Sequence, residues 1–194
     1  MPISVARRII FVGIAVCGAV GVLMQFLQQE DPRMPLWYFT VDAAILSSVF
    51  ASIAATRAKI VYAKVTAWLF TASIVSGIVY WSVIYPFNGI GQNLEMVLAN
   101  ILLHAILPVL ILVSQLSLCS LPRETRMLSS LSVPVIYLVA VIGSSRVLHQ
   151  EVPYAFLDIS IIGLQMFLLA MAGIGLITCG TFWLVCRLQS SLCC

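Results

Sequence analysis

Six long apolar stretches alternate with short polar segments along the chain. Crossing the hydrocarbon core of a bilayer takes about 20 apolar residues in a helix, and short connections favour antiparallel neighbours. The pattern therefore predicts an all-α, six-transmembrane-helix, up-and-down bundle that occupies residues 1–194 as a single domain. The six helices are expected at roughly 9–28, 36–56, 65–84, 97–117, 131–147 and 159–186.

The composition supports a lipid-solvated chain. Hydrophobic residues make up 62% of the sequence and charged residues only 9%, and the mean hydropathy is +1.10. So few polar groups cannot cover the surface of a water-soluble globule of 194 residues. We therefore expect a multi-pass integral membrane protein.

The basic residues orient the bundle. The N-terminus, the second and fourth connections and the C-terminus hold Arg7, Arg8, Arg57, Lys59, Lys64, Arg123, Arg126 and Arg187. The other side has only Arg33 and Arg146. Because cytoplasmic loops are enriched in Lys and Arg, both termini are predicted to be cytoplasmic. The net charge of +3 is explained by this topology, and no nucleic-acid partner is expected.

Polar side chains within the apolar stretches are the candidates for function, because they are costly in lipid. They are Thr40, Asp42, Asn100, His104, Gln115 and Gln165. The second and fourth helices run in the same direction. At 1.5 Å per residue, Thr40 lies about 6 Å below Leu36 and His104 about 10 Å below Val97. The two side chains are therefore predicted to meet in the outer half of the bundle.

Asn100, His104 and Pro108 follow one another at four-residue spacing and share one helix face. Pro108 has no amide hydrogen, so the carbonyl of His104 needs another donor. This polar niche indicates either a functional histidine or hydrogen bonds that join helices. For Thr40 alone, a bond back to its own helix would be enough.

Asp42 lies about 200° around the helix from Thr40, so the two cannot both point into one narrow site. It would be either an orienting partner of His104 or an ion-pair partner of Arg146.

The chain resembles the androgen-induced, FAR-17a-like family of integral membrane proteins, especially its short bacterial members. The resemblance rests on Trp37-Tyr38-Phe39-Thr40, on Asn100-Ile101-Leu102-Leu103-His104 with Pro108, and on Pro153-Tyr154-Ala155-Phe156-Leu157-Asp158. The chain departs from the family at Ala155, where proline is expected, and at Asp42-Ala43-Ala44, which lacks an asparagine often found after the threonine.

The resemblance implies an intramembrane hydrolase of lipid esters, such as fatty-acid esters of hydroxy fatty acids, in a bacterial plasma membrane. By position, Thr40 would be the nucleophile and His104 the histidine that assists it. A neutral imidazole can accept the threonine proton near pH 7. Asn100 is then the candidate auxiliary donor to the oxyanion, and Asp42 is a candidate substrate-binding or auxiliary residue.

Two other functions compete with this hydrolase hypothesis. One is a non-catalytic lipid-binding or membrane assembly protein. The other is a small transporter or channel, which would need polar groups across the whole bilayer. One deep histidine without a second ligand predicts no metal, and no cofactor is expected. The expected partners are membrane lipids or an acyl-ester substrate.

Overall fold

The computed structural model describes residues 5–30, 33–56, 72–91, 93–116, 124–148 and 152–192, and its regular elements there are all helical. By length and composition, four helices can cross a membrane. They are Val5–Gln28, Phe39–Thr56, Leu94–Leu116 and Ile159–Leu188. Two shorter apolar helices are Ala72–Ile84 and Pro134–Val147. The all-α prediction is thus confirmed for the described residues, and the four long apolar helices are compatible with a membrane protein.

The main helices are α1 (Val5–Gln28), α2 (Phe39–Thr56), α4 (Tyr85–Asn88), α5 (Leu94–Ile101), α6 (Leu107–Leu116), α7 (Glu124–Leu148) and α8 (Ile159–Leu192). The short elements are η1 (Met34–Trp37), η2 (Tyr80–Ile84), η3 (Leu102–Ile106) and η4 (Ala155–Leu157). The predicted third span, 65–84, is described from Ala72 onward, and η2 forms the end of this Ala72–Ile84 helix.

The second helix starts later than the predicted residue 36. Met34–Trp37 forms the separate 3₁₀ turn η1, which has a proline at its start. Tyr38 is then extended, with φ −89° and ψ 123°, so the α-helix begins anew at Phe39. Thr40 therefore lies in the first turn of α2, at the end of the helix where backbone N–H groups have no helical acceptor.

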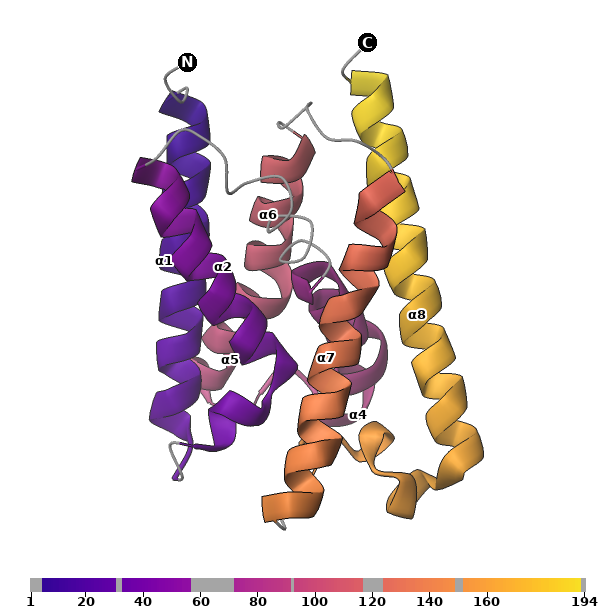
Figure 1. Ribbon diagram of the computed structural model, residues 1–194. Helices are drawn as coiled ribbons and strands as arrows, with labels where there is room; N and C mark the ends of the chain where they lie inside the picture. Colours follow the sequence, from indigo (N-terminus) through magenta and orange to yellow (C-terminus); the bar gives the residue numbers. More distant parts are fainter. Residues whose placement is uncertain are drawn as a thin grey trace.

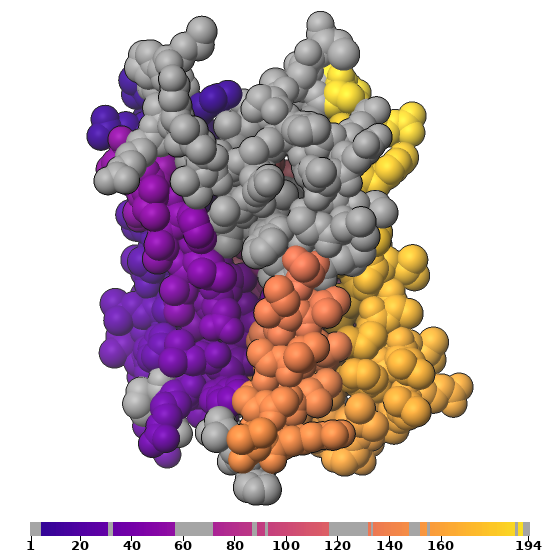
Figure 2. Space-filling model, viewed as in Figure 1, coloured from indigo at the N-terminus to yellow at the C-terminus, as the bar shows by residue number. Residues whose placement is uncertain are grey.

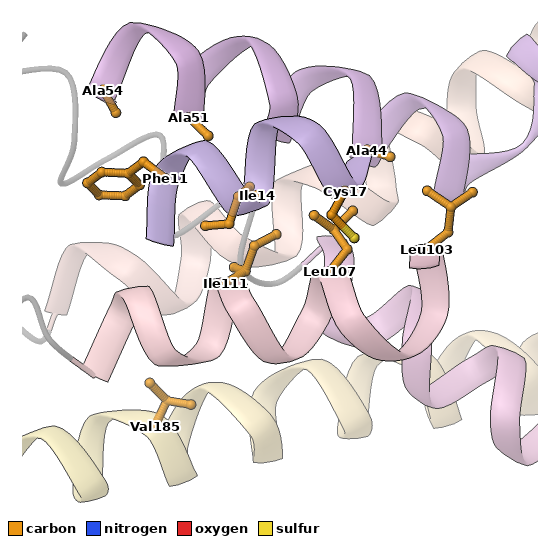
Figure 3. Close-up of a cluster of buried hydrophobic side chains, with 10 residues drawn as sticks. All are labelled: Phe11, Ile14, Cys17, Ala44, Ala51, Ala54, Leu103, Leu107, Ile111 and Val185. Atoms are coloured by element: carbon orange, nitrogen blue, oxygen red, sulfur yellow. The ribbon is translucent and has the colours of Figure 1, made fainter. Parts of the chain in front are cut away.

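The core lies between α1, α2 and the continuous helix made by α5, η3 and α6, with one side chain from α8 (Figure 3). Its side chains are Phe11, Ile14, Cys17, Ala44, Ala51, Ala54, Leu103, Leu107, Ile111 and Val185. Small residues allow close approach: a Cβ on Gly21 would lie 2.6 Å from the Leu103 side chain. Because lipid is as apolar as this core, such close packing takes the place of a hydrophobic driving force.

The start of α1 and the end of α8 lie at the same end of the bundle (Figure 1). On the face shown in Figure 2, α7 lies between α2 and α8. At the opposite end of the bundle, α7 is fastened to the start of α2. The Tyr137 hydroxyl donates to the carbonyl of Trp37 at 2.6 Å, and its ring meets Phe39 edge-on at 4.9 Å between centroids.

A short turn precedes α8. Asp158 accepts hydrogen bonds from the amide and hydroxyl of Ser160, and these bonds lower the pKa of its carboxyl group. Its main-chain carbonyl accepts from Ile161 and Ile162. The helix is then interrupted at Gly163, whose φ of 76° suits glycine. In this turn, the Tyr154 ring contacts Tyr38 just before α2.

Candidate functional site

Thr40 and His104 are joined through a third side chain, Ser76. The Thr40 and Ser76 hydroxyl oxygens are 2.6 Å apart, and the Ser76 oxygen is 3.4 Å from Nδ1 of His104. Thr40, Ser76 and His104 are buried, with 8%, 5% and 7% of their surfaces exposed, respectively. In the described part of the chain, no direct hydrogen bond joins Thr40 to His104. The predicted pair thus comes together as a chain of three groups.

His104 is held by one neighbouring helix, Ala72–Ile84. Ser76 contacts its ring nitrogen, and Tyr80 stacks on the ring with 3.9 Å between centroids and 8° between planes. Trp81 donates its indole N–H to the main-chain carbonyl of His104 at 3.0 Å. That carbonyl is the one predicted to need a donor. This helix therefore fixes the ring plane, the Nδ1 atom and the main-chain carbonyl of His104.

His104 lies in the π-helical turn η3, which Pro108 explains. Leu107 donates its N–H to the carbonyl of Leu102, five residues back. Pro108 follows with no N–H to give and with a ring that would clash with the carbonyl four residues earlier. A wider turn relieves that clash. The second π-turn, η2, likewise ends just before a proline, Pro86. Such turns are frequent at functional sites.

Gly77 permits the contact between these two π-turns. A Cβ at this position would lie 2.9 Å from the His104 carbonyl oxygen and 3.2 Å from Cγ of Pro108. Neither neighbour is the flexible end of a side chain. Only glycine therefore allows the Ala72–Ile84 helix to come close enough for Ser76 to reach the imidazole.

We expect Gly77→Ala to push the two helices apart and to lower stability by about 1–3 kcal/mol, the usual effect of overpacking. The midpoint of thermal unfolding in detergent measures this. Gly173→Ala is the matched control, because nothing lies within 4 Å of a Cβ there. Equal midpoints for the two variants would contradict the close approach at Gly77.

A wide cavity of about 590 Å³ reaches Thr40 and His104 from the end of the bundle opposite the start of α1. Polar groups from several connections line it, together with apolar ones. Its wall is formed by Gln25, Gln29, Tyr38, Thr40, Val41, Tyr80, Val83, Ile84, Gly89, Gly91, Met96, Asn100, Leu103, His104, Pro153, Tyr154, Phe156 and Ile162. An ester placed there would lie against both the hydroxyl of Thr40 and the imidazole of His104.

A narrow cavity of about 70 Å³ lies on the other side of Thr40 and is almost entirely apolar. Its wall includes Phe39, Thr40, Val75, Ser76, Val79, Ile84, Pro134, Tyr137, Leu138, Tyr154, Phe156, Leu157, Met171 and Ile174. It borders α2, the Ala72–Ile84 helix, α7 and α8. Thr40, Ile84, Tyr154 and Phe156 line both cavities, so the threonine stands between a cavity of mixed lining and one that is almost entirely apolar.

Tyr154 brings a hydroxyl group to the start of α2. Its ring meets Tyr38 edge-on at 5.7 Å between centroids. Burial raises the pKa of this phenol, although the nearby Thr40 side chain and the backbone of Thr40 and Phe39 act against the rise. Because the phenol stays protonated at neutral pH, it is a hydrogen-bond donor beside Thr40. The segment 153–158, which carries part of the family resemblance, therefore contributes Tyr154 to the site.

Asn100 lines the wide cavity, and its side-chain amide donates to the carbonyl of Ile90 at 2.7 Å. Together with the Tyr80 hydroxyl, which donates to Gly89 at 3.3 Å, it fastens the turn that closes one side of that cavity. An amide NH₂ has two hydrogens, so one remains for another acceptor.

Asp42 is not brought into the site. It lines neither cavity, and among the described residues no hydrogen bond or ion pair joins it to His104 or Arg146. The structure thus supports neither expected role, because the second side chain after Thr40 points to a different face of α2.

Ser76 and Tyr80 were not among the predicted site residues. A signal for them exists in the third apolar stretch, where Ser73, Ser76 and Tyr80 recur at helical spacing on one face beside Gly77. Serine is common in membrane helices, however, and this stripe by itself indicates only helix packing.

Comparison with known proteins adds nothing to this geometry, since no family model, no curated protein and no solved structure matches the chain.

Proposed function

We propose that this protein is an intramembrane hydrolase of lipid esters, with Thr40 as nucleophile and His104 as general base and acid. The observation that supports this most strongly is the buried hydrogen-bonded chain from Thr40 through Ser76 to His104, whose two end residues line a cavity that can admit a substrate. A threonine hydroxyl is weakly nucleophilic until a base takes its proton. An imidazole that is fixed on three sides is suited to that role.

Catalysis of acyl transfer also needs donors for the oxyanion. Tyr154 is our leading candidate, because its protonated hydroxyl stands beside Thr40 in both cavities. Asn100, at the wall of the wide cavity, is the auxiliary donor through its second amide hydrogen. Asp42 has no part in this mechanism.

We expect Tyr154→Phe to lower kcat by about 10²–10³-fold, which is the usual effect of removing one oxyanion donor. The aromatic contact with Tyr38 does not involve the hydroxyl and should survive. Steady-state kinetics on one ester, with thermal unfolding as the folding check, measure the effect. An unchanged kcat would remove Tyr154 from the mechanism.

The two cavities indicate the kind of ester. The wide cavity has room for a substrate with polar groups, whereas the narrow one excludes them. Its volume of about 70 Å³ is roughly half that of a cavity known to hold benzene, so it suits a short apolar group next to the ester carbonyl. The expected substrates are therefore amphipathic acyl esters that enter from the membrane.

The proposed setting is a bacterial plasma membrane, crossed six times, with both termini in the cytoplasm. The basic residues Arg7 and Arg8 near the start of α1 and Arg187 near the end of α8 support this orientation. The ends of the two helices lie together in Figure 1. With this orientation, the wide cavity would open towards the outer side.

The test is hydrolysis by the full chain purified in detergent. A panel would contain fatty-acid esters of hydroxy fatty acids, glycerol esters and short water-soluble esters. We expect turnover of the lipid esters, and none with Thr40→Val prepared identically, which controls for a contaminating esterase. Failure of the wild type on the entire panel would contradict the proposal and favour a lipid-binding or assembly role.

A further inference from the structure

We infer that Ser76 is a proton relay between Thr40 and His104, an inference that rests on the proposed hydrolase function. The hydroxyl of Ser76 lies between the two groups that the reaction must connect. It is 2.6 Å from the Thr40 oxygen and 3.4 Å from Nδ1 of His104. The distance of 3.4 Å between Ser76 and His104 is typical of a site without substrate. Such bonds shorten when substrate binds.

The surroundings of Ser76 differ from those of a hydroxyl that only joins helices. One turn earlier on the same helix, Ser73 lies 3.4 Å from the Ser47 hydroxyl. That pair is equally buried but lines neither cavity, and among the described residues no hydrogen bond joins it to an ionisable group. Ser76 instead contacts the histidine and borders the narrow cavity. The same interface thus contains a structural pair and a pair placed for chemistry.

Two other serines in these helices bond to their own backbone. Ser48 donates to the carbonyl of Ala44 and Ser82 to that of Ile78, each four residues back. Ser76 makes no such bond among its described contacts, and its oxygen is directed across to two other helices. In the His104 tautomer whose Nδ1 is an acceptor, the Ser76 hydroxyl can accept from Thr40 while it donates to His104.

The relay moves two protons together, which transfers one net proton from Thr40 to His104. As the Thr40 oxygen forms a bond to the acyl carbon, its proton passes to the Ser76 oxygen, and the Ser76 proton passes to Nδ1 of His104. The carbonyl π electrons move to the carbonyl oxygen. When the tetrahedral intermediate collapses, the bond to the leaving oxygen breaks and the imidazolium supplies that oxygen with the proton. Ser76 ends as it began, and water later releases the acyl group by the same path.

The test compares Ser76→Ala with Ser73→Ala in the full chain, on an ester that the wild type hydrolyses. We expect Ser76→Ala to lower kcat by about 100-fold, the scale of assisted proton transfer, with KM changed less than about threefold. Ser73→Ala should keep kcat. Ser76→Thr should restore most of it, since its hydroxyl remains and its extra methyl group faces the narrow cavity.

A proton inventory separates relay from structural support. The rate in mixtures of H₂O and D₂O should depend on deuterium content along a curve in the wild type, where two protons move together. A linear dependence in the wild type would overturn the relay. So would equal kcat for the two alanine variants. Inactivity of the wild type itself would instead remove the proposed function.

Discussion

Thr40→Val should reduce ester hydrolysis by about a thousandfold or more, to the level that binding and oxyanion contacts alone provide. Valine keeps the shape of threonine and removes only the hydroxyl group. The wide and narrow cavities should therefore persist, and KM for any residual turnover should change little. The measurement is kcat and KM on the best lipid ester of the panel.

Thr40→Ser is the informative partner of that variant. A serine hydroxyl in the same place keeps the contact with Ser76, so measurable activity should return. The Thr40→Val protein should also unfold close to the wild-type temperature. If Thr40→Val retains wild-type kcat, threonine is not the nucleophile, and the hydrogen-bonded chain has only a structural role.

His104→Gln should lower kcat by about 10²–10⁴-fold, the usual contribution of a general acid and base. Glutamine is polar and of similar size, so it can occupy the niche beside Ser76 and beneath the Tyr80 ring. It cannot exchange a proton near neutral pH. The loss should appear in kcat with little change in thermal stability, because Trp81 bonds to the main chain at this position.

If His104 has only a structural role, we expect a different result. In that case activity and unfolding temperature would fall together in His104→Gln. A stable His104→Gln protein that keeps full kcat would also exclude general base catalysis by this histidine.

The sequence predicted those features of the fold that follow from hydropathy and from backbone chemistry. Long apolar stretches predicted helices, and the missing amide of Pro108 predicted a carbonyl in need of a donor. The shared depth of Thr40 and His104 followed from helix rise and direction. Each of these predictions uses only local helix geometry or the chemistry of one proline, which is why a single sequence was enough.

The sequence could not predict how side chains meet across helices. A serine looks the same in the sequence whether its hydroxyl bonds back to its own helix, as that of Ser48 does, or across to another helix, as that of Ser76 does. The choice depends on the rotation of the Ala72–Ile84 helix and on its close approach at Gly77. The engagement of Asn100 with Ile90 and the stacking of Tyr80 on His104 depend on the same tertiary packing.

The most direct test of the central claim is to find which atom becomes covalently modified. The full chain in detergent would be treated with a long-chain alkyl fluorophosphonate, digested and mapped by mass spectrometry, with excess lipid ester as competitor. We predict one adduct, on Thr40, that is suppressed by the ester and absent from Thr40→Val. An adduct on Ser76 or elsewhere, in a protein that hydrolyses the ester, would contradict the account.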